Sequence, residues 1–307
     1  MRPIAVIETK PFNPYSVQFS PFHADRMAIS SAANYGIVGN GRLYFLVNNR
    51  IRKAYDTQDG LFDLSWSECH ENQIVTGGGD GSIKLWDVTL EDYPIQSFQE
   101  HTKEVYSVDW NCIEKKLFIS ASWDLSIKLW SPDRPRSINT WMEHTACIYQ
   151  AKWCPHVPYI LASASGDQHV KIWDTRQAVS VQTIHAHGNE VLALDWNKYN
   201  RDQIVTGSVD CSIKTWDIRN QSRPLVELRG HQYAVRNVKC SPHNGNIVAS
   251  TSYDMTMRVW DLSLGQQIFV HDLHTEFVLN LDFSLFQPGL MATCAWDESA
   301  HILQLSM

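Results

Sequence analysis

The sequence lacks the features that would place the chain in a membrane or in an oxidising compartment. Its 307 residues contain no apolar run long enough to span a bilayer. The opening stretch, MRPIAVIETK, lacks the apolar core of a signal peptide. The seven cysteines are odd in number and form no C-x-x-C pair, so neither a disulfide framework nor a zinc site is indicated. We therefore expect no membrane insertion and a reducing compartment, the cytosol or the nucleus.

The chain also lacks an excess of positive charge. It has 33 Asp plus Glu against 26 Lys plus Arg, a net charge of -7. Such a chain has no general attraction to nucleic acid or to an anionic membrane surface, and we expect neither as a partner. The closing residues LQLSM are not an S-K-L type of peroxisomal address.

What the sequence does contain is a repeat of 43 or 44 residues. Each unit carries a turn Asp, with Ser or Thr four residues before it. The turn residues are Asp80, Asp124, Asp167, Asp210, Asp254 and Asp297. A His stands 23 residues before each of the last five, at His101, His144, His187, His231 and His274. A Trp stands six residues after each of the first five, at Trp86, Trp130, Trp173, Trp216 and Trp260. A period of this length with these markers is typical of the WD-repeat β-propeller.

The number of blades follows from the strand rhythm. Apolar residues alternate within each unit, as in VYSVDW and IKLW, which predicts four short strands per unit. Six clear units follow a degenerate one that keeps the rhythm but lacks the markers. The last unit ends after its third strand, HILQL, so we expect IAVIET at the N-terminus to supply the fourth. The prediction is an all-β, seven-bladed WD-repeat β-propeller, a single domain over 1–307, with its first blade degenerate and its ring closed by the N-terminal strand.

The recurring Ser or Thr, His and Asp resemble the components of a hydrolase triad. The set recurs in five units, however, whereas a catalytic site needs one unique arrangement. We expect a buried hydrogen-bond network in each of these five units instead. No metal-ligand spacing, glycine-rich phosphate loop or unique acid–base pair is present, so we expect no enzyme, cofactor or metal. The other histidines, among them His156, His169, His185 and His243, are expected to be solvated on loops or strand edges.

Function is expected where the repeats differ, since the shared residues build the fold. In a propeller, the loop into each first strand and the turn before each Asp should lie on one face. Aromatic residues and carboxylates occupy these positions in several units. The candidate peptide-binding residues are Asp59, Phe62, Glu104, Tyr106, Trp123, Tyr149, Glu190, Leu192, Tyr253 and Trp296. Such a face suits an amphipathic helix that carries basic residues. Two alternatives remain: the rings pack on neighbouring blades, and the carboxylates are solvated rim charges.

Several stretches carry a resemblance to a known family. They are YGIVGNGRL at 35–43, DGLFDLSWSE at 59–68, HTKEVYSVDW at 101–110, SASGDQHVKIWD at 163–174, VDCSIKTWDIRN at 209–220 and HTEFVLNLDFSL at 274–285. The chain resembles the peroxisomal import receptors for the type-2 (N-terminal) targeting signal, the peroxin seven family. The resemblance implies a cytoplasmic cargo receptor that cycles to the peroxisome matrix. Its ligand would be a nine-residue signal, Arg–Leu, five residues, then His or Gln and Leu, on enzymes such as thiolase. It also implies a co-receptor that covers the bound signal and carries the complex to the docking complex.

A second class of function is left open by WDTR at 173–176 and WDIR at 216–219. The pattern W-D-x-R is found in substrate receptors of cullin-type ubiquitin ligases. Trp-Asp is the repeat's own ending, however, and an Arg two residues later arises easily by chance. A ligase receptor or another propeller scaffold therefore remains an alternative, because the fold alone does not choose among them.

Overall fold

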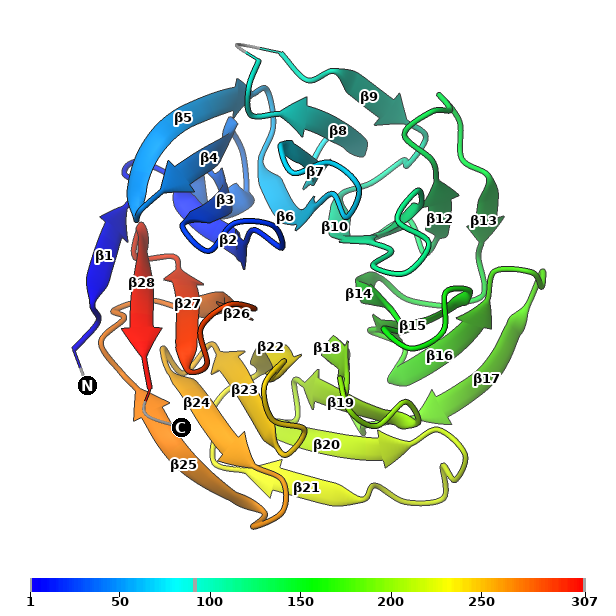
Figure 1. The fold of residues 1–307 in the computed structure, drawn as a ribbon. Coiled ribbons are helices and arrows are strands. Elements are labelled where there is room, and N and C mark those ends of the chain that lie inside the picture. The colour runs from blue at the N-terminus through cyan, green and yellow to red at the C-terminus, as the bar shows by residue number, and fades with distance from the viewer. Residues whose placement is uncertain (1, 91–92, 306–307) are drawn as a thin grey trace.

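Four-stranded antiparallel sheets stand as blades around a central axis (Figure 1). The structure is a computed structural model, and it describes residues 2–90 and 93–305. Within these residues there are seven such sheets and one short 3-10 helix, which confirms the all-β, seven-bladed propeller. No helix in these two ranges is long and apolar enough to cross a membrane.

The strands follow one another from the axis outward in every blade except the last. Blade 1 holds β2 (Asn13–Phe19), β3 (Arg26–Ala32), β4 (Gly41–Val47) and β5 (Arg50–Thr57), with the 3-10 helix η1 (Asn34–Gly36) between β3 and β4. Blade 2 holds β6 (Leu61–Trp66), β7 (Gln73–Gly78), β8 (Ser82–Asp87) and β9 (Gln96–Gln99). Blade 3 holds β10 (Val105–Trp110), β11 (Phe118–Ser122), β12 (Ile127–Trp130) and β13 (Asn139–Trp141). Blade 4 holds β14 (Ile148–Trp153), β15 (Ile160–Ser165), β16 (His169–Asp174) and β17 (Ser180–His185). Blade 5 holds β18 (Val191–Trp196), β19 (Gln203–Ser208), β20 (Ser212–Asp217) and β21 (Val226–Arg229). Blade 6 holds β22 (Val235–Cys240), β23 (Ile247–Ser252), β24 (Met257–Asp261) and β25 (Gln266–His271). Blade 7 holds β26 (Val278–Phe283), β27 (Leu290–Ala295), β28 (Ser299–Gln304) and, from the N-terminus, β1 (Ala5–Glu8).

Blade 7 closes the ring as the sequence predicted. Strand β1 pairs antiparallel with β28, with Ala5 opposite Ile302 and Glu8 opposite Ser299. The side chain of Ile7 is only 5% exposed and joins the core cluster that blades 1 and 7 share. The hydroxyl of Tyr44 donates a hydrogen bond of 2.7 Å to the carbonyl of Thr9. The N-terminal strand is therefore fixed to blade 1 as well as to blade 7.

The repeated polar residues form the buried network expected in the five units that carry the full set, blades 3 to 7. In blade 4, His144 Nδ1 lies 2.7 Å from Asp167 Oδ2, and His144 Nε2 lies 2.7 Å from Ser163 Oγ. The indole N–H of Trp173 donates to the same Ser163 oxygen over 2.9 Å. Burial raises the pKa of Asp167, but the hydrogen bond and charge of His144 outweigh it and lower this pKa to about 2. Blades 3, 5 and 6 repeat all four members, and blade 7 repeats the His, Asp and Thr.

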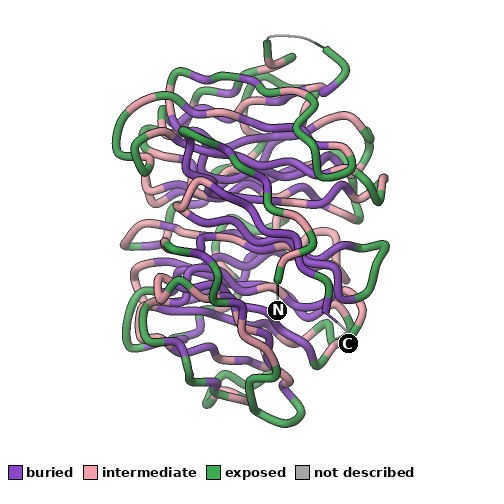
Figure 2. The backbone as a smooth tube through the Cα atoms, turned by 90° about the vertical axis from the view of Figure 1, so that its left-hand side faces the viewer, coloured by how far each residue is buried: buried purple, intermediate pink, exposed green. Residues whose placement is uncertain are grey.

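Side chains on the innermost strands also join neighbouring blades. Four carboxylates on innermost strands each accept a main-chain N–H from the innermost strand of the following blade. The pairs are Asp63 with Val108 N, Asp109 with Trp153 N, Asp195 with Cys240 N and Asp282 with Phe19 N, at 2.8–3.0 Å. Buried residues follow the strands, whereas exposed residues gather in the connecting loops (Figure 2). The buried strands of the blades therefore hold two sets of loops, one at each end of the axis.

Candidate ligand-binding face

The loop into each first strand lies beside the turn that precedes the Asp. In blade 3, the N–H of Trp123 donates to the carbonyl oxygen of Glu104 over 3.1 Å. The same main-chain bond joins Gly79 to Gly60, Gly166 to Cys147, Val209 to Glu190, Tyr253 to Ala234 and Trp296 to Phe277. The pairing of Val105 with Ser122 puts this bond at one end of the blade, because the β10–β11 hairpin is at the other. The predicted placement of both positions on one face is confirmed.

Aromatic rings follow one another along this face from blade 6, through the closure, to blade 4. We call the aromatic arc the series Tyr253, Phe277, Trp296, Tyr15, Phe62, Tyr106, Trp123 and Tyr149. Successive ring centroids from Tyr253 to Trp123 are 4.8–5.9 Å apart, and Tyr149 lies 6.1 Å from both Tyr106 and Trp123. These separations are typical of favourable aromatic contacts. Six of the predicted site residues therefore belong to one continuous surface.

The arc is less exposed than a free aromatic patch. Trp123, Tyr253 and Trp296 are partly buried, as are Tyr106 and Tyr149. Phe62 is 6% exposed, and Leu192, which lies outside the arc in blade 5, is 5% exposed. The rings thus pack on neighbouring blades; Tyr15 and Phe62 are buried, whereas the other members of the arc stay partly accessible to solvent. The rings of Tyr106 and Trp123 stack face to face, with centroids 4.8 Å apart and an angle of 18° between their planes, so each ring covers one face of the other.

The predicted carboxylates differ in their surroundings. Glu104 is partly buried and Glu190 is exposed, and neither carboxylate is hydrogen-bonded or ion-paired to any other residue that the structure describes. Asp59 is partly buried, and its Oδ1 accepts the N–H of Gly60 over 2.7 Å. Burial and then the charge of Glu190 raise the pKa of Tyr149, which keeps its hydroxyl protonated. A cationic ligand group can therefore reach Glu104 or Glu190 without breaking an internal ion pair.

Two glycines make room for these carboxylates. A Cβ atom on Gly79 would lie 2.8 Å from Asp59 Oδ1, which is closer than real contacts allow. A Cβ atom on Gly166 would lie 3.3 Å from Glu190 Oε1 and 3.5 Å from the ring of Tyr149. The position before the turn Asp is thus small where a carboxylate lies across it. In blades 3 and 7, this position carries Trp123 and Trp296.

Arg236 belongs to this face and was not among the predicted site residues. It starts on β22 in blade 6, yet its guanidinium carbon lies 5.1 Å from the centre of the Tyr106 ring in blade 3. The residue is 7% exposed. Burial lowers the pKa of Arg236, but the neighbouring Tyr106 and Tyr253 and the Asp63 charge raise it overall, so the cation persists. The sequence holds one signal that could have identified Arg236 as a site residue. The equivalent position of the other six blades carries an aromatic residue or Leu, and Arg236 alone is charged there.

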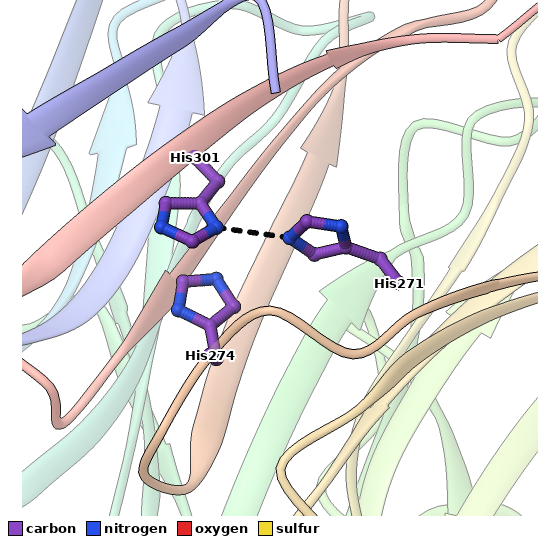
Figure 3. Close-up of side chains that lie close together, drawn as sticks. All are labelled: His271, His274 and His301. Carbon is purple, nitrogen blue, oxygen red and sulfur yellow. Dashed lines mark hydrogen bonds between the residues drawn. The ribbon is translucent and has the colours of Figure 1, made fainter. Parts of the chain in front are cut away.

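Two buried histidines at the seam of blades 6 and 7, His271 and His301, contradict the expectation that histidines outside the repeat are solvated. His271 is 0% exposed and His301 is 7% exposed. Their rings meet through a hydrogen bond of 2.9 Å, next to His274 (Figure 3). The His274 ring lies nearly parallel to that of His301, with centroids 3.9 Å apart. Its Nδ1 is hydrogen-bonded to Asp297, and its Nε2 is hydrogen-bonded to Thr293. Lone pairs in two parallel ring planes do not converge on one ion, so this cluster does not have the geometry of a metal site.

Several charged groups at the opposite end of the axis and in the W-D-x-R turns pair with each other. A cavity of about 320 Å³ lies around the axis at the opposite end. Its lysines pair with its aspartates, with Lys152 bound to Asp109, Lys198 to Asp195 and Lys239 to Asp282 at 2.8–3.3 Å. The arginines of the two W-D-x-R patterns pair within their own turns, Arg176 with Asp174 and Arg219 with Asp217. The carboxylate of Glu68 in the same cavity has no hydrogen-bond or ion-pair partner among the described residues, so the continuous series of rings beside its carboxylates is what distinguishes the face that carries the arc.

Known proteins resemble this chain over nearly its whole length. Residues 50–87 and 92–131 match the family model "WD domain, G-beta repeat", and residues 136–260 match the EIPR1 beta-propeller model. The Peroxisomal targeting signal 2 receptor of Dictyostelium discoideum is 63% identical over 286 residues, which cover 91% of this chain and 90% of the relative. The Peroxisome biogenesis protein 7 of Arabidopsis thaliana is 56% identical, with 97% and 96% covered. The Peroxisomal targeting signal 2 receptor of Mus musculus is 51% identical, with 94% and 92% covered. The family resemblance found in the sequence is thereby confirmed, and the chain belongs to the family of peroxisomal targeting signal 2 receptors.

Proposed function

We propose that this protein is the receptor that binds the N-terminal type-2 targeting signal of peroxisomal matrix enzymes, such as thiolase, on the face that carries the aromatic arc. Two relatives over 50% identical bear the name of a receptor for this signal, which supports the ligand class. The observation that carries the location is the aromatic arc lying beside carboxylates without internal partners. The function requires binding and release and no covalent step.

The signal would lie on this face as an amphipathic helix. Its apolar side would rest on the stacked pair Tyr106 and Trp123, which is rigid before the ligand arrives. Its Arg would bind the carboxylate of Glu104, on the loop that enters β10, with Glu190 as a further carboxylate on the same face. A charge-assisted hydrogen bond of this kind contributes about 1.5–3 kcal/mol. A co-receptor would then cover the bound helix and carry the complex to the peroxisomal docking complex.

A binding measurement with purified protein tests the proposal. A labelled thiolase N-terminal peptide should bind the parent protein, with and without co-receptor, and the same peptide with its Arg changed to Glu should bind weakly. Glu104→Ala should weaken binding of the unmodified peptide about 10- to 150-fold, from the loss of one charge-assisted hydrogen bond. Glu114→Ala is the matched control, because Glu114 is an exposed carboxylate on the β10–β11 connection at the other end of the same blade.

Two outcomes would contradict the proposal at different levels. Equal affinity of the parent protein for the signal peptide and for a scrambled peptide would exclude signal recognition. Specific binding that Glu104→Ala and Glu114→Ala leave equally unchanged would keep the function and move the Arg pocket elsewhere on the ring.

A further inference from the structure

The side chain of Arg236 closes the axis beneath the aromatic arc. It leaves β22 in blade 6 and ends above the ring of Tyr106 in blade 3. Strands β22 and β10 of these two blades lie on opposite sides of the ring of blades (Figure 1). No carboxylate of the described chain lies within ion-pair distance of its guanidinium. The positive charge at the centre of the face is therefore not neutralised by a direct partner.

The space below this cation is polar and too small for a ligand side chain. A cavity of about 10 Å³ is lined by Arg236, Asn237 and Asn280, by Tyr15, Tyr106 and Tyr149 of the arc, and by Asp63, whose charge acts on Arg236 without a direct ion pair. The Oδ1 atoms of Asn237 and Asn280 are buried and have no hydrogen-bond partner among the described residues. A volume of this size holds no more than about one water molecule. A ligand on this face therefore stays above Arg236 and meets its charge at close range.

We propose that Arg236 is a specificity-determining residue of the signal-binding site. This inference rests on the proposed function and deepens it. The guanidinium excludes a cationic ligand side chain from the centre of the face, and so restricts such a side chain to the unpaired Glu104 and Glu190. It also favours a ligand side chain with a hydrogen-bond acceptor, a carboxamide or a carboxylate, at the position that faces the axis. The face thus discriminates between ligands by the positions of their charged side chains as well as by their apolar side.

A set of substituted signal peptides tests this assignment. Each residue of the peptide in turn is replaced by Lys, Gln and Glu, and the affinity of the parent protein is measured. At the position that faces the axis, the Lys peptide should bind about 10- to 100-fold more weakly than the Gln peptide, from like charges a few ångströms apart in a partly buried site. The Glu peptide should bind at least as tightly as the Gln peptide.

Variants of the receptor then assign the discrimination to Arg236. Arg236→Met should reduce the Lys-to-Gln difference at that position to less than about 3-fold, whereas Arg236→Lys keeps the charge and should retain it. Lys239→Met is the matched control, because Lys239 lies on the same strand at the opposite end and pairs with Asp282. Discrimination that survives in Arg236→Met, or the absence of any such position in the parent protein, overturns the assignment.

The role of Arg236 can be tested even if Arg236→Met does not fold. Thermal unfolding shows whether Arg236→Met is folded, and Arg236→Gln replaces it if it is not. In the parent protein alone, the penalty on the Lys peptide should persist when NaCl is raised from about 0.05 to about 0.5 M, because salt screens buried charges weakly. A penalty that disappears with salt would place the discrimination on exposed charges and refute the role of Arg236. Failure of the parent protein to bind the unmodified signal would instead refute the proposed function.

Discussion

Replacing His144 with Ala should lower stability and leave ligand binding intact. The change removes two hydrogen bonds of 2.7 Å. The Ser163 oxygen, which is 0% exposed, still accepts the Trp173 N–H, but the Ser163 hydroxyl proton loses its acceptor. Asp167 Oδ2 loses one donor and keeps the N–H of Thr145. A buried hydroxyl left unpaired costs about 1–3 kcal/mol and a lost hydrogen bond to a charged group about 1.5–3 kcal/mol, so the free energy of unfolding should fall by about 2–6 kcal/mol. At about 2.1 cal/mol/K per residue, the unfolding entropy of 307 residues is about 640 cal/mol/K. The melting temperature should therefore fall by about 3–9 °C.

Calorimetry of the variant and of a matched control measures this effect. His185→Ala is the control, because His185 is an exposed histidine on β17 of the same blade, and its melting temperature should change by less than about 1 °C. Well below both melting temperatures, His144→Ala should bind the signal peptide within about 3-fold of the parent protein. If His144→Ala keeps its melting temperature and loses only peptide binding, the repeated polar sets serve function and the structural assignment is refuted.

Three further predictions follow from the structure. Deleting residues 1–10 should expose the edge of the last blade, and limited proteolysis and gel filtration should show cleavage there or aggregation, whereas a resistant, monodisperse truncation would contradict the closure. Burial and neighbouring His274 lower the pKa of His271 to about 4, below its unfolded value of about 6.5, so the unfolded chain binds more protons between these values. Stability should fall as pH drops from about 6.5 to about 4, and His271→Phe should flatten this slope in melting curves; an unchanged slope would contradict it. Gly79→Ala should displace the Asp59 carboxylate and weaken peptide binding about 3- to 10-fold, whereas Gly166→Ala should bind nearly as the parent does; equal effects would exclude a role for Asp59.

The spacing of the markers was enough to predict the blades and their buried networks. His144 and Asp167 are 23 residues apart, which is the distance from the end of one blade to the middle turn of the next, and this spacing recurs five times. The missing fourth strand after HILQL predicted that β1 completes blade 7, because an open edge in a closed ring needs a partner. The connection after β3 could not be predicted in the same way. Asn34 and Tyr35 adopt positive φ there, held by hydrogen bonds from the Tyr15 hydroxyl to Tyr35 O and from Tyr35 N to Asn13 Oδ1, and no repeat marker specifies that loop.

The buried histidines His271 and His301 lie where residue type alone gives a wrong prediction. His271 stands three residues before His274, and other units carry an apolar core residue at this position, at Phe98, Trp141, Ile184 and Leu228. The alignment of the repeat therefore indicated burial, whereas the ordinary preference of a single histidine indicated solvent. Repeat position determined the burial of His271, because a side chain on an outer strand points in the same direction as the side chains at the equivalent position of the other blades.

The same register placed Arg236 on the face but could not predict what it touches. Repeat position determines where a Cα atom lies. For Glu104 this is enough to predict the location of the side chain, because that side chain remains in its own blade. Arg236 meets Tyr106 only because the ring of blades closes and because a long side chain extends across the axis. Its contact therefore depends on all seven blades, including the pairing of β1 with β28. An N-terminal truncation that opens the ring should consequently disturb the charge at the centre of the face, even though the deleted residues lie in blade 7 and far from blade 3.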